Sequence, residues 1–182
     1  MQSIKSPKMN FSLNRSIEIL ERTPVVVSEL TRGLSSEWTN TNEGEGTWNA
    51  LDVVGHLIHG DKTDWIPRAE VILSDSNDKV FPPFDRFGQM ETSKGKTLLQ
   101  LLVEFKMERV SNMNRLQNLH ITEQDFSKTG IHPTFGIVSL AQLLSAWVVH
   151  DLDHISQITR IMAKQYKEQT GPWIEFLKIL RH

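Results

Sequence analysis

The sequence predicts an all-α protein built as a four-helix bundle. Four long segments carry apolar residues at the spacing of an amphipathic helix, and no segment shows convincing strand alternation. The 182 residues fit one domain that is large enough to bury a hydrophobic core. Four long helices in a domain of this size are typical of a bundle. We expect residues 1–8 to form a disordered lead-in and residues 9–182 to form the single domain.

The first two predicted helices each contain a proline. The first helix covers about residues 11–34, and Pro24 inside it is expected to kink or divide it. A polar loop at residues 39–46 separates this helix from the second one, for which Thr47 is the expected N-cap. Pro67 is expected to break or kink the second helix.

The second half of the chain is predicted to hold the other two long helices. Before them, residues 74–96 lack periodicity, and an irregular segment of this length is often functional or mobile. We expect this segment to close over a pocket and to select the substrate. The remaining expected elements are a third helix at about residues 97–119, a loop at 130–136, a fourth helix at about 139–166 and a short terminal helix that starts at 171–173.

Composition argues against several classes of protein. The formal net charge of −2 and the lack of a lysine and arginine block argue against nucleic-acid binding. No apolar run approaches the roughly 20 residues of a membrane span, and no signal-peptide pattern is visible. Cysteine is absent, which removes disulfides, thiolate metal ligands and a cysteine nucleophile, and which fits a cytoplasmic location. Any thiol that takes part in the chemistry must therefore come from a substrate.

Two histidines four residues apart, His150 and His154, follow an apolar run at residues 137–149. At this spacing both imidazoles lie on one face of a helix and can point at one ion. The apolar run indicates that both are partly buried, and a divalent metal would satisfy the two at once. Two histidines that are hydrogen-bonded in the core are the alternative. A metalloprotease site is rejected, because that pattern has a Glu where this chain has Asp151.

A tetrahedral catalytic metal site needs a third protein ligand and leaves the fourth position open. His56 is a candidate on the apolar part of the second helix, beside Gly55, which lets another helix approach closely. His59 shares part of that face and is the reserve candidate. His132 lies in a proline-flanked loop, either at the mouth of a pocket or simply on the surface. Favourable helix-dipole contacts are enough to explain the two histidines that follow helix ends, His120 and His182.

Other residues near these histidines have two interpretations each. Asp151 and Asp153 flank the pair but point off its face, so they either orient the ligands or form solvated positions or salt bridges. Asp52, one turn before His56, is equally ambiguous. Arg109 is either a surface charge or a side chain that reaches into a cavity. Three tryptophans either wall the pocket or pack in the core: Trp48, Trp65 and Trp147.

A recognisable family pattern runs through three stretches, WNALDVVGHL at 48–57, HPTFGIVSLAQLL at 132–144 and HDLDHISQI at 150–158. In this order and at these separations they resemble the DinB-like superfamily, which includes YfiT-type metal-dependent hydrolases and bacterial transferases of low-molecular-weight thiols. The resemblance covers about residues 9–173. It implies an up-down-down-up four-helix bundle, a homodimer and a three-histidine metal site that holds zinc or nickel. Matched residue by residue, the implied ligands are His56, His150 and His154, and His59 falls outside the pattern.

The resulting hypothesis is a metal-dependent enzyme that acts on a small molecule. The ion would lower the pKa of a bound water or of a substrate thiol, which fits either a hydrolase or a thiol S-transferase. A low-molecular-weight thiol is then one expected partner. The first alternative is a non-catalytic, dimeric, stress-related binding module with a structural or vestigial metal. The second alternative is a metal-free bundle whose histidines are buried and hydrogen-bonded.

Overall fold

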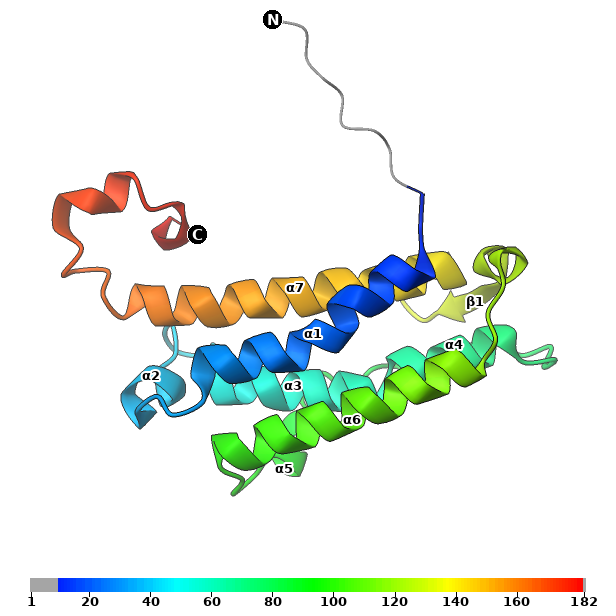
Figure 1. The fold of residues 1–182 in the computed structure, drawn as a ribbon, viewed down its shortest axis with the longest axis horizontal. Helices are drawn as coiled ribbons and strands as arrows, with labels where there is room; N and C mark the ends of the chain where they lie inside the picture. Colours follow the sequence, from blue (N-terminus) through cyan, green and yellow to red (C-terminus); the bar gives the residue numbers. More distant parts are fainter. Residues whose placement is uncertain (1–9, 182) are drawn as a thin grey trace, which may run out of the picture.

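A computed structural model describes residues 10–181 of the chain as an all-α four-helix bundle. Its four members are α1 (Leu13–Thr31), α3 (Ala50–Thr63) continued by α4 (Trp65–Leu73), α6 (Leu98–Asn118) and α7 (Leu140–Lys164). The helices α1 and α7 run in one direction, and α3, α4 and α6 run in the other, which gives the up-down-down-up order (Figure 1). The predicted fold class is thereby confirmed. The predicted lead-in at residues 1–8 lies outside the described residues, as does His182.

Several short elements connect the long helices. They are α2 (Ser36–Asn40), α5 (Gly88–Thr92), the 3₁₀-helices η1 (Glu123–Ser127), η2 (Gly171–Glu175) and η3 (Lys178–Leu180), and an antiparallel hairpin of β1 (Thr129–His132) and β2 (Gly136–Ser139). The loop expected at residues 130–136 contains the turn of this hairpin, whose strands showed no convincing alternation in the sequence. Each strand has only four residues, too few for alternation to show, and β1 gains further hydrogen bonds from the preceding irregular segment through Phe81 N to Ile131 O. The expected short terminal helix is present as 3₁₀ turns.

Three long helices begin at capping boxes. In a capping box, two residues three positions apart each accept, through the side chain, the backbone N–H of the other. Thr97 and Gln100 cap α6, and Ser139 and Gln142 cap α7. The prediction of Thr47 as the cap of α3 was wrong, because Asn49 accepts from Asp52 N at 2.9 Å and Asp52 accepts from Asn49 N at 3.0 Å. Thr47 instead closes the preceding loop by accepting from the backbone N–H of Glu43. The role of Asp52 is therefore that of a helix cap.

The helix α1 continues through Pro24, so of the two expected outcomes, a kink or a division of the helix, division does not occur. A proline cannot donate to the carbonyl four residues before it, which leaves Leu20 O without its helical partner. Arg109 on α6 takes that place, donating from Nη1 to Leu20 O at 2.7 Å. The predicted break near Pro67 is present, because α3 ends at Thr63 and α4 places Pro67 in its first turn, where no helical hydrogen bond is lost.

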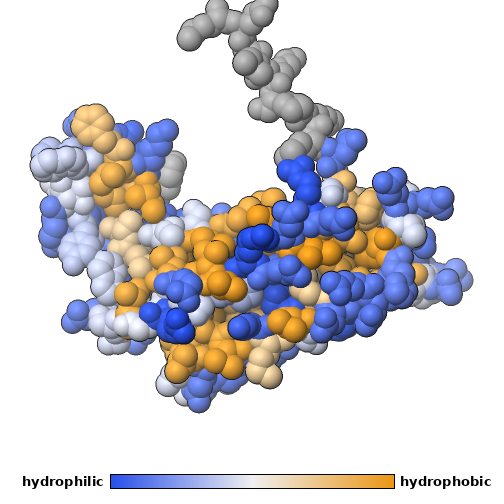
Figure 2. All heavy atoms as spheres, in the orientation of Figure 1, coloured by the Kyte–Doolittle hydropathy of each residue, from blue (hydrophilic) through white to orange (hydrophobic). Residues whose placement is uncertain are grey.

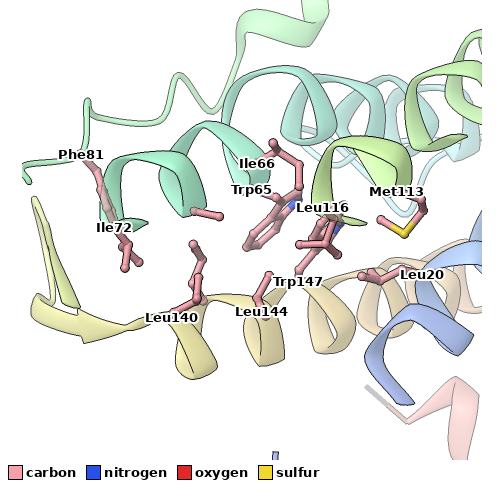
Figure 3. Packing of buried hydrophobic residues seen from close by; sticks show 12 residues of the cluster. Leu20, Trp65, Ile66, Ile72, Phe81, Met113, Leu116, Leu140, Leu144 and Trp147 are labelled. Carbon is pink, nitrogen blue, oxygen red and sulfur yellow. The ribbon is translucent and has the colours of Figure 1, made fainter. Parts of the chain in front are cut away.

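The core consists of two apolar clusters along the bundle. One joins α4, α6 and α7 around Trp65 and Trp147, whose rings stack with centroids 5.9 Å apart (Figure 3). The other joins α1, α3, α6 and α7 around Leu57, Phe105 and Ile158. Apolar side chains also gather on the surface over the start of α6 (Figure 2), where Leu99 is exposed. None of the described helices is long and apolar enough to cross a membrane.

Candidate metal centre

Three histidines from two helices converge inside the bundle. His56 comes from α3, and His150 and His154 lie one turn apart on α7. His150 Nε2 lies 3.1 Å from His56 Nε2 and 3.1 Å from His154 Nε2, and ligand atoms of all three lie within 4.8 Å of one another. Two nitrogens that bind one ion at about 2.05 Å are roughly 2.9 Å apart at an octahedral angle and roughly 3.3 Å apart at a tetrahedral angle. The observed spacing falls between these values.

Hydrogen bonds alone cannot satisfy the three Nε2 atoms. Gln157 Oε1 accepts from His154 Nδ1 at 2.7 Å, which leaves only a lone pair on His154 Nε2. His150 Nε2 faces both other Nε2 atoms, but it can carry only one proton, so at most one of the two contacts is a hydrogen bond. A divalent cation would accept a lone pair from each nitrogen. The donor set therefore fits a metal ion.

Burial keeps His56 and His154 in the neutral form that binds a metal. Burial lowers the pKa of His56 to about 3, and the neighbouring imidazoles of His154 and His150 lower it as well. Burial also lowers the pKa of His154 to about 4, against the opposing hydrogen bond with Gln157. His56 and His154 are therefore deprotonated at neutral pH, with their nitrogens available as ligands.

The histidines lie on the wall of a cavity of about 1150 Å³. Aromatic rings surround them: Trp48 lies 4.7 Å from the His56 ring centroid, Phe84 meets the same ring edge-on at 5.7 Å, and Trp65 meets the His150 ring edge-on at 5.0 Å. A cavity of this size exceeds what a water molecule needs and is large enough for a small organic molecule. The histidines are thus placed where they could reach a bound substrate.

Two segments outside the bundle complete the cavity wall. The irregular segment at 74–96 contributes Phe81, Phe84 and Arg86 to this wall, and its closing over the pocket and selection of a substrate stay predictions. The hairpin contributes its tip, where Phe135 is 76% exposed and stacks on His132 at 4.4 Å. His132 Nδ1 accepts from the backbone N–H groups of Thr134 and Phe135, which fixes the tip. Of the two interpretations of His132, the structure therefore supports a place at the mouth of the pocket.

Arg109 is neither a surface charge nor a side chain that reaches into a cavity, because it lies in the core with 1% exposure. It donates to both carboxylate oxygens of Asp61 at 2.8 and 3.0 Å and to both of Asp151 at 2.5 and 3.1 Å. Burial raises the pKa of Asp61 to about 6 despite this pairing. Burial also acts to raise the pKa of Asp151, but Arg109, His150 and Thr23 together hold it below its ordinary value. Asp151 is thus a buried ion-pair partner, not a solvated residue.

The other candidate residues from the sequence lie outside the three-histidine cluster. The ring of His59 packs 5.2 Å from Phe84, and its buried Nε2 has no hydrogen-bond partner among the described residues. His120 ends α6 with a φ of 47°. Asp153 is exposed on the cavity wall, and Trp147 is fully buried in the core.

Two groups of ion pairs that shape the cavity were not predicted from the sequence. Asp64 and Arg68 form a buried pair at 2.6 Å, and their separation of four residues on a helix was a usable signal. Glu43 accepts from Arg160 at 2.9 Å and from Lys164 at 2.8 Å, and no local pattern relates residues so far apart. The hydrogen bond from Arg160 lowers the pKa of Glu43 to about 2. This second group ties the loop before Trp48 to α7.

Comparison with known proteins identifies the family of this chain. The model of the DinB superfamily matches residues 19–158, which is most of the chain. The chain belongs to the DinB superfamily. The resemblance predicted from the three sequence stretches is therefore confirmed. Proteins of Bacillus cereus strains B4264 and G9842 are each 23% identical to this chain over 158 residues, which cover 86% of this chain and 89% of each relative. Their names assign them provisionally as metal-dependent hydrolases.

A solved structure shows the same fold as this DinB-superfamily protein. YfiT from Bacillus subtilis is described as a probable metal-dependent hydrolase with an unusual four-helix bundle topology. It matches with a TM-score of 0.72 at 21% identity, over 88% of this chain and 93% of YfiT. The shared topology brings one face of α3 against one face of α7, and the three histidines of this superfamily member lie between these two helices.

Proposed function

We propose that this DinB-superfamily protein is a metal-dependent enzyme that acts on a small molecule. His56, His150 and His154 would hold one divalent ion, and three imidazoles suit zinc or nickel. The observation that carries this proposal is the convergence of three Nε2 atoms on the wall of a cavity large enough for a substrate. Three protein ligands leave a further position for a water or a substrate atom.

The ion, when bound, supplies Lewis acidity and lowers the pKa of a coordinated water or thiol towards neutrality. The chain's own residues prepare the site for that chemistry. Gln157 accepts from His154 Nδ1, which directs the lone pair of Nε2 into the site. Trp48 and Phe84 pack against His56 and limit access of bulk water to it. Trp65 packs in the same way against His150.

The reaction that we propose is hydrolysis or thiol S-transfer. Names of the curated relatives support hydrolysis. The lack of cysteine in this chain means that a thiol nucleophile would have to be a substrate, such as a low-molecular-weight thiol. An open cavity beside the histidines favours either enzyme over a binding module with a structural metal, because a structural site is closed by a fourth protein ligand.

Metal analysis of purified variants tests the site. We expect about one divalent ion per chain in the wild type and a strong loss of metal in His56→Ala and in His150→Ala. His59→Ala is the matched control, because it removes a histidine from the same helix one turn away, outside the cluster. Unchanged metal content in both cluster variants, or an equal loss in His59→Ala, contradicts the proposed site.

Turnover by metal-loaded protein tests the function. The substrates are a panel of esters and amides, and a panel of electrophiles offered together with low-molecular-weight thiols. We expect the wild type to turn over a substrate from one of the two panels. We expect the two cluster variants to lack this activity. Full metal loading with no turnover in either panel would favour the non-catalytic module.

A further inference from the structure

The buried ion cluster lies directly behind one of the proposed ligands. Asp151 follows His150 in the sequence, and its Oδ1 lies 3.9 Å from His150 Nδ1. That nitrogen is buried and has no hydrogen-bond partner among the described residues. An imidazole that binds a metal through Nε2 carries its proton on Nδ1, and this N–H needs an acceptor. Asp151 is the carboxylate placed to accept it.

The position of Asp151 is fixed from three sides of the bundle. Arg109 on α6 donates to Asp151 on α7, to Asp61 on α3 and to the carbonyl of Leu20 on α1. Both carboxylates are 0% exposed, so neither can move to solvent. Pro24 frees the carbonyl of Leu20 for this use. The guanidinium therefore holds the Asp151 carboxylate at a set distance from His150.

The cluster also has more negative than positive charge. One guanidinium faces two carboxylates, so the ionised group has a net charge of −1 in a region that excludes water. A divalent cation among three neutral imidazoles would offset that charge. Asp61 shares the guanidinium and the burial of Asp151, but only Asp151 is found beside a proposed ligand.

We propose that Asp151, held by Arg109, is a positioning residue that accepts the Nδ1 proton of His150 and directs His150 Nε2 to the metal. This inference rests on the proposed function, because it needs a metal at the three histidines. Carboxylates in this role typically contribute roughly 10- to 100-fold in metal affinity. Asp61, by contrast, is inferred to be a partner of Arg109 alone.

Cobalt binding to two matched variants tests the proposal. Asp151→Asn and Asp61→Asn remove the same charge from the same guanidinium at the same burial, and only the first changes the partner of His150. We expect Asp151→Asn to weaken cobalt binding roughly 10- to 100-fold and to change the visible spectrum of the bound ion. We expect Asp61→Asn to stay within about threefold of the wild type, with an unchanged spectrum. An equal loss in both variants, or no loss in Asp151→Asn, overturns the proposal.

A measurement on the wild type decides the matter if Asp151→Asn does not fold. Long-range ¹H–¹⁵N spectra of the zinc-loaded protein report which nitrogen of His150 carries the proton. We expect the proton on Nδ1 and the metal on Nε2. A His150 that binds zinc through Nδ1, or that lacks a proton on Nδ1, overturns the proposal. Failure of the wild type to bind cobalt or zinc at all would instead remove the proposed function and, with it, this inference.

Discussion

Replacement of Arg109 by methionine is expected to destabilise the bundle far more than the same change at Arg115. Both arginines lie on α6 and both pair with a carboxylate on another helix, Arg115 with Glu70 at 2.8 Å. The side chains of Arg115 and Glu70 are 40% and 43% exposed, whereas the side chain of Arg109 is 2% exposed. Methionine keeps much of the apolar stem in each case. The comparison therefore isolates the effect of burying the charge.

The magnitudes follow from what each variant leaves behind. Arg109→Met leaves two buried carboxylates without a counter-charge, and removing one partner of a buried pair costs about 3–5 kcal/mol. Arg115→Met leaves one exposed carboxylate in water, and such pairs contribute about 0–1 kcal/mol. In a chain of this length each kcal/mol moves the Tm by about 2–4 °C, so Arg109→Met should lower it by about 6–20 °C.

Urea unfolding at neutral pH, followed by circular dichroism, measures both variants. The pKa of Asp151 is held low in the folded wild type, so its stabilising effect exists above the ordinary carboxyl pKa and is lost as the pH falls below it. The stability difference between the wild type and Arg109→Met should therefore shrink under acid conditions. Equal destabilisation by the two methionine variants at neutral pH would refute the reasoning.

Three further predictions concern the loop anchor, the hairpin and the contact between α3 and α5. Glu43→Gln should lower the free energy of unfolding at pH 7. The difference from wild type should vanish as the pH falls from 4.5 through about 2, because Glu43 stabilises the fold only while it is ionised. A pH-independent difference in urea melts contradicts this. Phe135→Ala should weaken binding of a fluorescent apolar probe several-fold in a fluorescence titration. Phe176→Ala is the control and should not weaken it, because Phe176 is 80% exposed but lies outside the cavity wall. Equal effects of the two variants would count against a hairpin tip that binds substrate. Gly55→Ala should destabilise the protein by about 1–3 kcal/mol, because its Cβ would lie 2.5 Å from Ser93 Oγ. Adding Ser93→Ala to this variant should restore part of the lost stability in thermal melts. A Gly55→Ala variant that is more stable than the wild type would contradict the close contact.

The bundle could be predicted because its signals are local. Apolar spacing located the long helices and placed the starts of α6 and α7 within a residue or two of those observed. The hairpin and α5 were missed because elements of four or five residues carry too little periodicity. The choice between a kink and a division at Pro24 could not be made from the sequence for a different reason. Its effect on α1 depends on Arg109, a residue distant in sequence that takes up the freed carbonyl.

The candidate site could likewise be predicted only where its signals are local in the sequence. The pairing of His150 and His154 follows from helix geometry alone, and the structure places both where that geometry predicts. The residues left two histidines open on the second helix, and the family pattern chose His56 over His59. The structure supplies the physical distinction, since His56 Nε2 faces His150 at 3.1 Å while His59 packs under Phe84.

Burial of Arg109 is the part that no local pattern could predict. Its environment is made of one carboxylate from α3, one from α7 and one carbonyl from α1, and these meet only after the bundle closes. The two carboxylate contacts join the helix that carries His56 to the helix that carries His150 and His154. A bound metal would join those two helices a second time. Because both links restrain the same pair of helices, metal binding and the Arg109 cluster should stabilise the fold in a coupled way, and loss of either should make the protein more dependent on the other.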